Sequence, residues 1–500
     1  RQKQNDSADY FLGGRDATWL AIGASIFASN IGSEHLIGLA GAGASSGMAM
    51  AHWEIQGWMI LILGWVFVPF YSRSMVYTMP EFLERRYNPQ SRTILSVISL
   101  VSYVLTKVAV TVYAGGLVFQ QVFGIKELWG IDFFWIAAIG LVVLTALYTI
   151  FGGMKSVLYT SVLQTPILLL GSLIILVLGF KELGGWDEMM RVCGAVTVND
   201  YGDTMTNLIR SNDDANFPWL GALIGSAIIG FWYWCTDQFI VQRVLSGKNE
   251  KEARRGTIFG AYLKLLPVFL FLIPGMIAFA LHQKYIGAGG EGFLPMLANG
   301  TANADAAFPT LVAKLLPAGV KGLVVCGILA ALMSSLASLF NSSAMLFTID
   351  FYKRFRPETP EKKLVGIGQI ATVVIVILGI LWIPIMRSVG DVLYTYLQDV
   401  QSVLAPGIAA AFLLGICWKR TSAQGGMWGL IAGMIIGLTR LGAKVYYSNA
   451  GEVADSTFKY LFYDMNWLFF CGWMFLFCII VVIVVSLATE APTAEKIQGL

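Results

Sequence analysis

The sequence predicts an all-α, polytopic membrane protein, and three observations support that prediction. Of its 500 residues, 56% are hydrophobic and only 13% are charged, whereas a soluble domain carries about 25% charged residues. The mean hydropathy is +0.68. About twelve stretches have the roughly 20 mostly apolar residues that cross a bilayer core of about 30 Å. These stretches use most of the chain and leave no segment for a sizeable soluble domain.

The predicted spans follow one another with short connectors. They fall at 17–46, 53–72, 93–123, 132–151, 157–180, 217–241, 257–282, 310–350, 364–387, 391–417, 424–446 and 462–488. The connectors after every second span are rich in basic residues, such as Arg85, Arg86 and Arg254. Because basic residues mark the cytoplasmic side, we expect residue 17 in the cytoplasm and the long loops 183–216 and 283–309 outside.

Polar residues and glycine interrupt two of the spans. The first reads ASIFASNIGSEHLIGLAGAGASSG and contains Asn30, Glu34 and His35, and the sixth reads SAIIGFWYWCTDQF and contains Asp237. The interruptions are five spans apart, and broken helices at matching places in two halves are typical of an inverted-repeat transporter. For the glycine-rich stretch 38–47, close helix packing is the simpler explanation.

This symmetry predicts the organisation of the chain. The expected parts are a cytoplasmic N-terminal segment 1–16, a first five-helix repeat 17–182, an extracellular loop 183–216, a second five-helix inverted repeat 217–417, two additional C-terminal helices within 418–489 and a cytoplasmic tail 490–500.

A few polar side chains inside the spans are candidates for binding a solute. Glu54, Lys264 and Gln398 supply a carboxylate, an ammonium and an amide, which bind the hydroxyls of a neutral polyol in complementary donor and acceptor roles. Aromatic residues that suit the apolar face of a sugar ring lie nearby in sequence: Trp53, Tyr233, Trp234, Tyr394 and Tyr396. Each residue alone also has a structural explanation, since Glu54 could be an interfacial acid and Lys264 could snorkel toward the cytoplasm.

The eighth span contains a candidate sodium site. In ILAALMSSLASLFNSSAM, Ala331, Ser334 and Ser335 lie on nearby turns of one helix. Sodium needs several oxygen ligands, which two hydroxyls and the carbonyls freed by a broken helix would supply. The alternative is that these serines pack and bond to their own backbone. No nucleophile–base pair or cofactor motif indicates an enzyme, and the net charge of +3 gives no indication of nucleic-acid binding.

Several longer segments resemble the sodium/solute symporter family, in particular its sodium/glucose cotransporter branch. They are FASNIGSEHLIGLAGAGASSG, FGGMKSVLYTSVLQT, FWYWCTDQFIVQRVLSGKN, YLKLLPVF, LMSSLASLFNSSAMLFTIDFY and AAAFLLGICWKR. The likeness runs from about residue 9 to residue 488. It implies a LeuT-type inverted repeat of 5+5 helices with additional helices, and a first family span that lies outside this numbering.

The resemblance also implies roles for individual residues. The substrate-binding residues would be His35, Glu54, Lys264, Gln398, Tyr233 and Trp234. The outer hydrophobic gate would be Leu39, Trp53 and Tyr394. The sodium ligands would be the carbonyls of Ala28, Ile31 and Ala331 and the hydroxyls of Ser334 and Ser335.

Four positions depart from the family pattern. Gly230 and Gly57 stand where relatives can place a polar side chain toward the sugar. Ser161 replaces a frequent aspartate, and Ala337 replaces a hydroxyl of relatives that bind two sodium ions. We therefore predict one sodium per sugar.

The expected function is sodium-coupled symport of a glucose- or galactose-type monosaccharide by alternating access in the plasma membrane, or in the inner membrane of a bacterium. The alternatives are a symporter of the same family for myo-inositol, sialic acid, proline, choline or an anion, and a sugar-gated sensor or ion channel on the same fold. The sodium ion, the sugar and the lipid bilayer are the expected partners, with no nucleic acid and no enzymatic activity.

Overall fold

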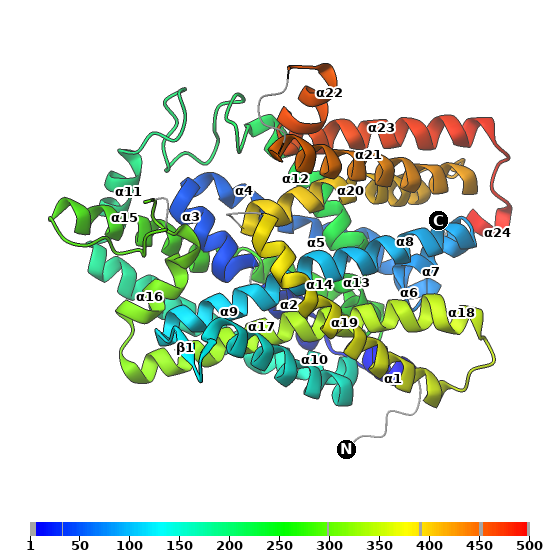
Figure 1. The fold of residues 1–500 in the computed structure, drawn as a ribbon. Coiled ribbons are helices and arrows are strands. Elements are labelled where there is room, and N and C mark those ends of the chain that lie inside the picture. Colours follow the sequence, from blue (N-terminus) through cyan, green and yellow to red (C-terminus); the bar gives the residue numbers. More distant parts are fainter. Residues whose placement is uncertain (1–6, 33, 298–299, 390–392, 450–453, 498–500) are drawn as a thin grey trace.

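Long apolar helices run side by side in the computed structural model (Figure 1), which describes residues 7–32, 34–297, 300–389, 393–449 and 454–497. Among these residues, nine helical segments are long and apolar enough to cross a membrane. Two of the nine, Glu34–Ser74 and Phe133–Leu183, turn at Gly47 and Gly153 and so hold more than one predicted span. Two shorter apolar helices, Trp19–Asn30 and Ala109–Phe123, belong to the first and third predicted spans.

The first predicted span is broken, as expected. It consists of α2 (Trp19–Asn30), the π-helix η2 (Glu34–Leu39) and α3 (Ala40–Ser46), preceded by α1 (Ser7–Leu12) and a short turn η1 (Gly13–Arg15). α2 ends where Ile31 leaves the helical conformation, with φ −79° and ψ 88°. α2 packs against α10, α14 and α17, so the break lies at the centre of the bundle.

The next two spans are helices with local changes of winding. The second comprises η3 (Gly47–Met50), α4 (Ala51–Ile55), η4 (Gln56–Trp58), α5 (Met59–Ile62), η5 (Leu63–Phe67) and α6 (Val68–Ser74). After α7 (Met79–Arg86), the third comprises α8 (Pro89–Ser102), η6 (Tyr103–Val108) and α9 (Ala109–Phe123). A two-stranded antiparallel hairpin, β1 (Glu127–Leu128) and β2 (Ile131–Asp132), leads to the next helix.

The fourth and fifth predicted spans form one helical segment, α10 (Phe133–Leu183), that turns at Gly153. Gly153 has φ 58° and ψ −156°, and a Cβ there would lie 2.5 Å from the carbonyl oxygen of Tyr10. Only glycine fits this conformation and this close approach. The turn is therefore fixed by one residue within the predicted connector between residues 151 and 157.

The second half of the chain repeats the pattern of a broken helix followed by longer ones. After α11 (Trp186–Gly194), the sixth span comprises α12 (Trp219–Gly230), the π-helix η7 (Phe231–Thr236) and α13 (Gln238–Leu245), with Asp237 in an extended conformation between the last two. The seventh comprises α14 (Glu250–Leu263), η8 (Val268–Leu272) and α15 (Ile273–Gly287).

The predicted eighth span, 310–350, begins eight residues too early. Residues before Pro317 form a separate short helix, α16 (Ala307–Leu315), after η9 (Ala304–Ala306). The span proper is α17 (Ala318–Met345), continued by η10 (Leu346–Tyr352) and α18 (Lys353–Phe355). Leu316 precedes the proline in an extended conformation, because a residue before proline is disfavoured in a helix.

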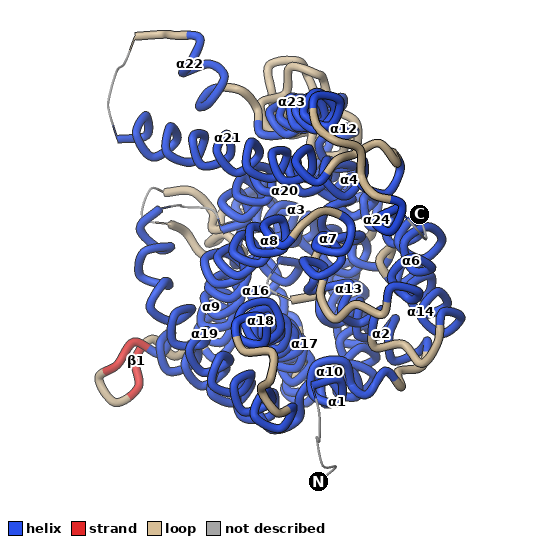
Figure 2. Tube along the Cα trace, turned by 90° about the vertical axis from the view of Figure 1, so that its right-hand side faces the viewer, coloured by secondary structure: helices blue, strands red, loops and turns tan. Residues whose placement is uncertain are grey.

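The chain ends with the remaining helices, and the last long ones cover one side of the bundle. They are α19 (Glu361–Val389), α20 (Leu393–Cys417), α21 (Ala423–Asn449), α22 (Thr457–Lys459), η11 (Tyr460–Asp464), α23 (Trp467–Ala488) and α24 (Ala494–Ile497). α21 and α23 pack on α20 and α12, at the top of Figure 2.

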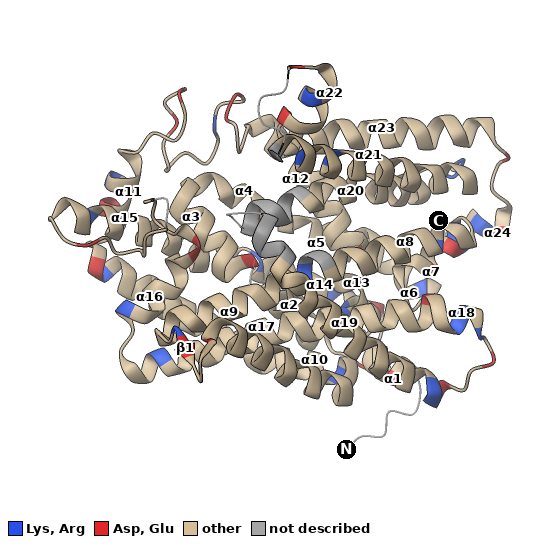
Figure 3. Ribbon diagram, in the orientation of Figure 1, with Lys and Arg blue, Asp and Glu red and all other residues tan. Residues whose placement is uncertain are grey.

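Charged residues lie mostly toward the two ends of the long helices, and few lie in the middle (Figure 3). Large apolar side chains such as Leu163, 72% exposed, cover the outside of the bundle. A soluble protein rarely exposes so much apolar surface, whereas a bilayer solvates it. The few charges in the middle of the bundle are therefore the residues that need a functional explanation.

The connector between α11 and α12 packs on the turn after α3. Met48 donates a backbone hydrogen bond of 2.7 Å to Met205, and Arg210 donates to the carbonyl of Ser46. Hydrogen bonds from Asn199 and from the Ser211 amide lower the pKa of Asp203, because they stabilise its charged form. This connector ties one end of the broken first span to the second half of the chain.

Candidate functional site

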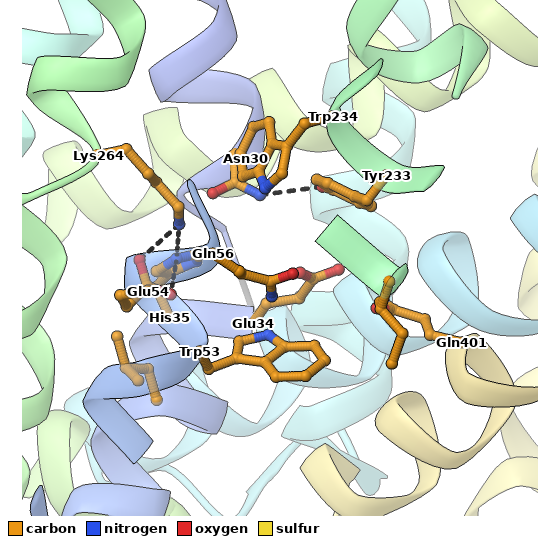
Figure 4. Close-up of a pocket in the computed structure, with 12 residues that line it drawn as sticks. Asn30, Glu34, His35, Trp53, Glu54, Gln56, Tyr233, Trp234, Lys264 and Gln401 are labelled. Atoms are coloured by element: carbon orange, nitrogen blue, oxygen red, sulfur yellow. Dashed lines mark hydrogen bonds and ion pairs between the residues drawn. The ribbon is translucent and has the colours of Figure 1, made fainter. Parts of the chain in front are cut away.

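A small cavity lies at the level of both helix breaks. It is lined by Asn30, Glu34, His35, Leu39, Trp53, Glu54, Gln56, Ile229, Tyr233, Trp234, Lys264 and Gln401 (Figure 4). The volume of the cavity is about 20 Å³. A cavity of this size holds about one water molecule. A solute must therefore displace side chains or exchange their mutual hydrogen bonds to enter.

Three of the predicted substrate-binding residues form one buried group, which we call the pocket cluster: His35, Glu54 and Lys264. The Lys264 ammonium lies 2.7 Å from Glu54 Oε2 and 2.6 Å from His35 Nε2. His35 Nε2 lies 3.2 Å from Glu54 Oε1. The three side chains come from η2, α4 and the end of α14, so the pocket cluster joins three segments distant in sequence.

Local backbone features position the pocket cluster. Lys264 follows α14, where the helix is interrupted before Pro267. Its aliphatic stem passes over Gly57, where an added Cβ would lie 2.5 Å from Lys264 Cγ. The absence of a side chain at Gly57, noted above as a departure from the family, thus makes room for the lysine that pairs with Glu54.

The two predicted aromatic residues, Tyr233 and Trp234, also line the cavity. Their rings meet edge to face at 4.8 Å. Asn30 Nδ2 donates a 2.9 Å hydrogen bond to the Tyr233 hydroxyl, which joins the break of the first span to that of the sixth. Lys264 Nζ lies 5.6 Å from the centre of the Trp234 ring, within the range of a cation–π interaction.

Of the predicted outer gate, Leu39 and Trp53 line the cavity. The centre of the Trp53 ring lies 5.5 Å from the centre of the Trp467 ring of α23. The side chains of Tyr394 and Gln398 lie outside the described residues, so their predicted roles stay predictions.

Several lining residues were not among the predicted binding residues: Asn30, Glu34, Gln56, Ile229 and Gln401. Gln401 lies three residues after Gln398, and this spacing puts both on one helix face, so it could have been found from the sequence. Gln56 occupies the space opened at Gly230, where an added Cβ would lie 2.7 Å from Gln56 Oε1. That relation depends on the packing of α12 against η4 and has no sequence signal.

The predicted sodium ligands lie where α2 ends and contacts α17. The amide of Gly32, which would bond to Ala28 in a continuous helix, donates to Asn30 instead. The amide of His35 donates to Gly32 rather than to Ile31. The helix break therefore removes the usual helical partners of the Ala28 and Ile31 carbonyls.

The two predicted serines face this break. The Ser335 hydroxyl donates a 2.8 Å hydrogen bond to the Ser29 carbonyl, and an added Cβ on Gly32 would lie 2.4 Å from Ser335 Oγ. Ser334 Oγ lies 3.2 Å from Ser161 Oγ of α10. All five predicted ligands thus belong to two segments that touch, with Ala331 buried one turn earlier on α17.

A second buried charge group lies beside the cavity, and we call it the break cluster: Tyr103, Lys107 and Asp237. Lys107 Nζ lies 2.5 Å from Asp237 Oδ2, and the Tyr103 hydroxyl donates to Asp237 Oδ1. Asp237 also caps α13 by accepting a hydrogen bond from the Phe239 amide. Lys107 Nζ lies 4.4 Å from the centre of the Tyr233 ring. No member of this cluster lines the cavity.

Comparison with known sequences matches this chain to transporters. The sequence profile of the sodium:solute symporter family matches residues 10–433. The human sodium/myo-inositol cotransporter 2 is 36% identical over 513 aligned residues, covering 100% of this chain and 75% of that protein. The sodium/myo-inositol cotransporter of dog is 37% identical over 521 residues, covering 100% of this chain and 71% of that protein.

Comparison with solved structures matches the fold. A Na⁺-coupled sialic acid symporter in its substrate-bound outward-open state has a TM-score of 0.77 at 21% identity, over 98% of this chain and 94% of that one. Mhp1, a nucleobase-cation-symport-1 family transporter, has a TM-score of 0.55 at 13% identity, over 99% and 98%. These similarities confirm the predicted all-α, LeuT-type fold.

Proposed function

The chain belongs to the sodium:solute symporter family and is a sodium-coupled symporter of the plasma membrane, and from that premise we propose that its solute is a neutral polyol, with myo-inositol as the first candidate. It is a transporter rather than an enzyme. The proposal rests on the hydrogen-bonding groups of the cavity.

The polar groups of the cavity without a partner among the described residues include both acceptors and donors. Asn30 Oδ1 and Gln56 Oε1 are buried without a hydrogen-bond partner among the described residues, and the carboxylate of Glu34 adds two more acceptor oxygens. Trp234 Nε1 is an unpaired donor. Hydroxyl groups donate and accept, so a polyol satisfies both kinds. Unpaired buried polar groups cost about 1–3 kcal/mol each, so such a solute binds with a large gain.

An anionic solute fits these groups poorly. A carboxylate would bring acceptor oxygens toward the acceptors of Asn30 and Gln56 and a negative charge toward Glu34 and Glu54. The cation of the cavity, Lys264, is already paired with Glu54 at 2.7 Å. The cavity therefore favours a neutral polyol over a solute of the sialic acid kind.

Among polyols, similarity to known proteins favours a cyclitol. The relatives reported above, 36–37% identical, are sodium/myo-inositol cotransporters. A glucose- or galactose-type monosaccharide remains the second candidate, because the same donors and acceptors serve its hydroxyls. The two classes differ at one or two hydroxyl groups, and competition between solutes separates them.

In the proposed mechanism, sodium binds between the break of the first span and α17. There it replaces the contact between Ser335 and the Ser29 carbonyl and fixes η2, which carries His35. The polyol then exchanges hydrogen bonds with the pocket cluster, and Trp53 and Leu39 close over it. Coupling requires sodium to prefer the solute-competent state. One charge moving through 100 mV contributes about 2.3 kcal/mol.

We further propose a stoichiometry of one sodium per solute. Position 161 carries a neutral serine beside Ser334 rather than a carboxylate, and Ala337 supplies no hydroxyl. Reversal potentials measured at several sodium and solute gradients should give one charge per solute. A ratio of two would contradict this assignment and require a second cation site.

The test of the proposed function is sodium-driven uptake into sealed proteoliposomes that contain the purified chain. Radiolabelled myo-inositol should accumulate above its external concentration only with an inward sodium gradient. Unlabelled myo-inositol should compete better than glucose or galactose, and sialic acid should not compete. Stronger competition by glucose would replace the cyclitol by a hexose. Sodium current without accumulation would indicate a solute-gated channel.

A further inference from the structure

The carboxylate of Glu34 is the starting point. Glu34 begins η2 after the break of the first span, and it lines the same cavity as Gln56 and Trp53 (Figure 4). Among the described residues, no hydrogen bond or ion pair to its carboxylate is found, whereas Glu54 has Lys264 and Asp237 has Lys107. Its side chain is partly exposed to the cavity, and a carboxylate between apolar helices without an ion-pair partner is a candidate functional group.

The proposed sodium site consists only of uncharged oxygens. Its ligands are the carbonyls of Ala28, Ile31 and Ala331 and the hydroxyls of Ser334 and Ser335. Bringing a cation from water to neutral oxygens in a membrane interior is unfavourable unless a negative charge lies nearby. The site therefore lacks a counter-charge of its own.

Glu34 is close to this site along the chain. It is three residues from Ile31, so their Cα atoms are at most about 11 Å apart. Gly32, between them, lies against Ser335, since a Cβ added to it would be 2.4 Å from Ser335 Oγ. Sodium and Glu34 would then be neighbours.

The surrounding charges increase the need for a counter-charge. Glu54 is neutralised by Lys264, and Asp237 by Lys107. Arg243 is fully buried and donates a 3.0 Å hydrogen bond from Nε to Ser29 Oγ, next to the site, while its Nη1 and Nη2 atoms have no partner among the described residues. An approaching sodium ion therefore meets a second positive charge.

We propose that Glu34 is the counter-charge of the coupled sodium ion and a positioning residue for sodium in this chain. This proposal for Glu34 rests on the proposed sodium site and does not depend on the identity of the solute. Because the same carboxylate lines the cavity, sodium and solute act on one turn of the chain, and their coupling is reciprocal.

The experiment measures binding of ²²Na⁺ to the purified full chain by scintillation proximity, without solute and at constant ionic strength. E34Q should weaken sodium affinity about tenfold, as expected for one charge about 10 Å away in a medium of effective dielectric constant about 20. E34D keeps the charge and should bind sodium within about threefold of the wild type. E361Q removes one charge at a distant ion pair with Lys353 and should have no effect.

A second variant keeps the test decisive if E34Q is unstable. Q56E adds a carboxylate to the same cavity and should strengthen sodium binding several-fold. Wild-type sodium affinity in E34Q, or equal losses in E34Q and E34D, would overturn the proposal. So would a loss of solute affinity in E34Q with sodium binding intact, which would make Glu34 a solute ligand alone. Because no solute is present in the sodium titration, failure of the polyol assignment leaves this result unaffected.

Discussion

The pocket cluster and the break cluster contain the same chemistry in different surroundings. Each pairs a buried carboxylate with a buried ammonium, Glu54 with Lys264 and Asp237 with Lys107. The pocket cluster opens on a cavity with further unpaired polar groups. In the break cluster, both carboxylate oxygens of Asp237 have partners, and the aromatic rings of Tyr233 and Phe239 lie near Lys107.

This difference suggests different roles for the two clusters: the pocket cluster exchanges hydrogen bonds with a solute, and the break cluster stabilises the helix break. The pocket cluster lines a cavity, so a solute hydroxyl that enters it can exchange hydrogen bonds with the side chains of the cluster. In the break cluster, a partner changes only if α13 moves away from the third span, because Asp237 also caps α13. We expect changes in the first cluster to affect solute binding and changes in the second to affect stability and conformational exchange.

The largest expected effect is the loss of solute uptake in the variant Glu54→Ala. The variant removes the carboxylate and leaves Lys264 without its charge partner, a change that costs about 2–5 kcal/mol in buried pairs. Uptake in proteoliposomes should fall more than about 100-fold. The elution profile should stay that of the folded protein, since the cavity lets water reach Lys264. Solute affinity like that of the wild type would remove Glu54 from the binding site.

The second largest expected effect is a loss of thermal stability in the variant Asp237→Asn. This variant keeps the cap of α13 but leaves the Lys107 ammonium unpaired. Removing one partner of a buried pair costs about 3–5 kcal/mol, so the thermal transition in detergent should fall by several degrees or more. Solute affinity at saturating sodium should change little.

The matched control for this variant is the double substitution D237N and K107M, which removes both charges and should recover much of the lost thermal stability. A loss of solute affinity in D237N as large as that of E54A, with stability unchanged, would contradict the separation of the two clusters.

A smaller effect is expected for the double substitution S334A and S335A. It removes two predicted sodium ligands and should raise the sodium concentration for half-maximal uptake about tenfold or more, since each hydroxyl contributes about 1 kcal/mol. Ser343→Ala is the control, because Ser343 lies on the same helix, and its hydroxyl has no hydrogen-bond partner in the described part of the chain. Unchanged sodium dependence of uptake in the double variant would exclude these serines from the site.

The smallest effect is expected for Trp234→Phe. The phenyl ring keeps the aromatic face toward the Tyr233 ring, and the indole N–H donor is lost. One neutral hydrogen bond of about 1 kcal/mol predicts a roughly fivefold weaker solute affinity, measured by competition against labelled solute. An unchanged affinity would assign Trp234 to packing.

Much of the fold follows from local sequence. The apolar stretches and the interruptions of the first and sixth spans are found near their predicted positions, and the extended conformation of Asp237 lies at the second interruption. The predicted eighth span begins too early because hydropathy alone does not distinguish α16 from α17, and Pro317 is the residue that separates them.

The residues that line the cavity are predictable from the sequence to a lesser degree. His35, Glu54 and Lys264 stand out because charged or titratable groups are rare inside apolar spans. Asn30 and Gln56 do not stand out, because an amide near a helix break or end is common and becomes a lining group only when another helix leaves space, as Gly230 does for Gln56.

The sequence by itself determined the membrane class, the breaks of the first and sixth spans, and which polar residue types lie inside apolar segments, because these depend on hydropathy and on helix-disrupting residues along the chain. Only the tertiary structure decided which charges are paired. Glu54 meets Lys264, Asp237 meets Lys107, and no such partner among the described residues meets Glu34. The physical reason is that ion pairing depends on distances between helices remote in sequence, and those distances are set by side-chain packing rather than by local pattern.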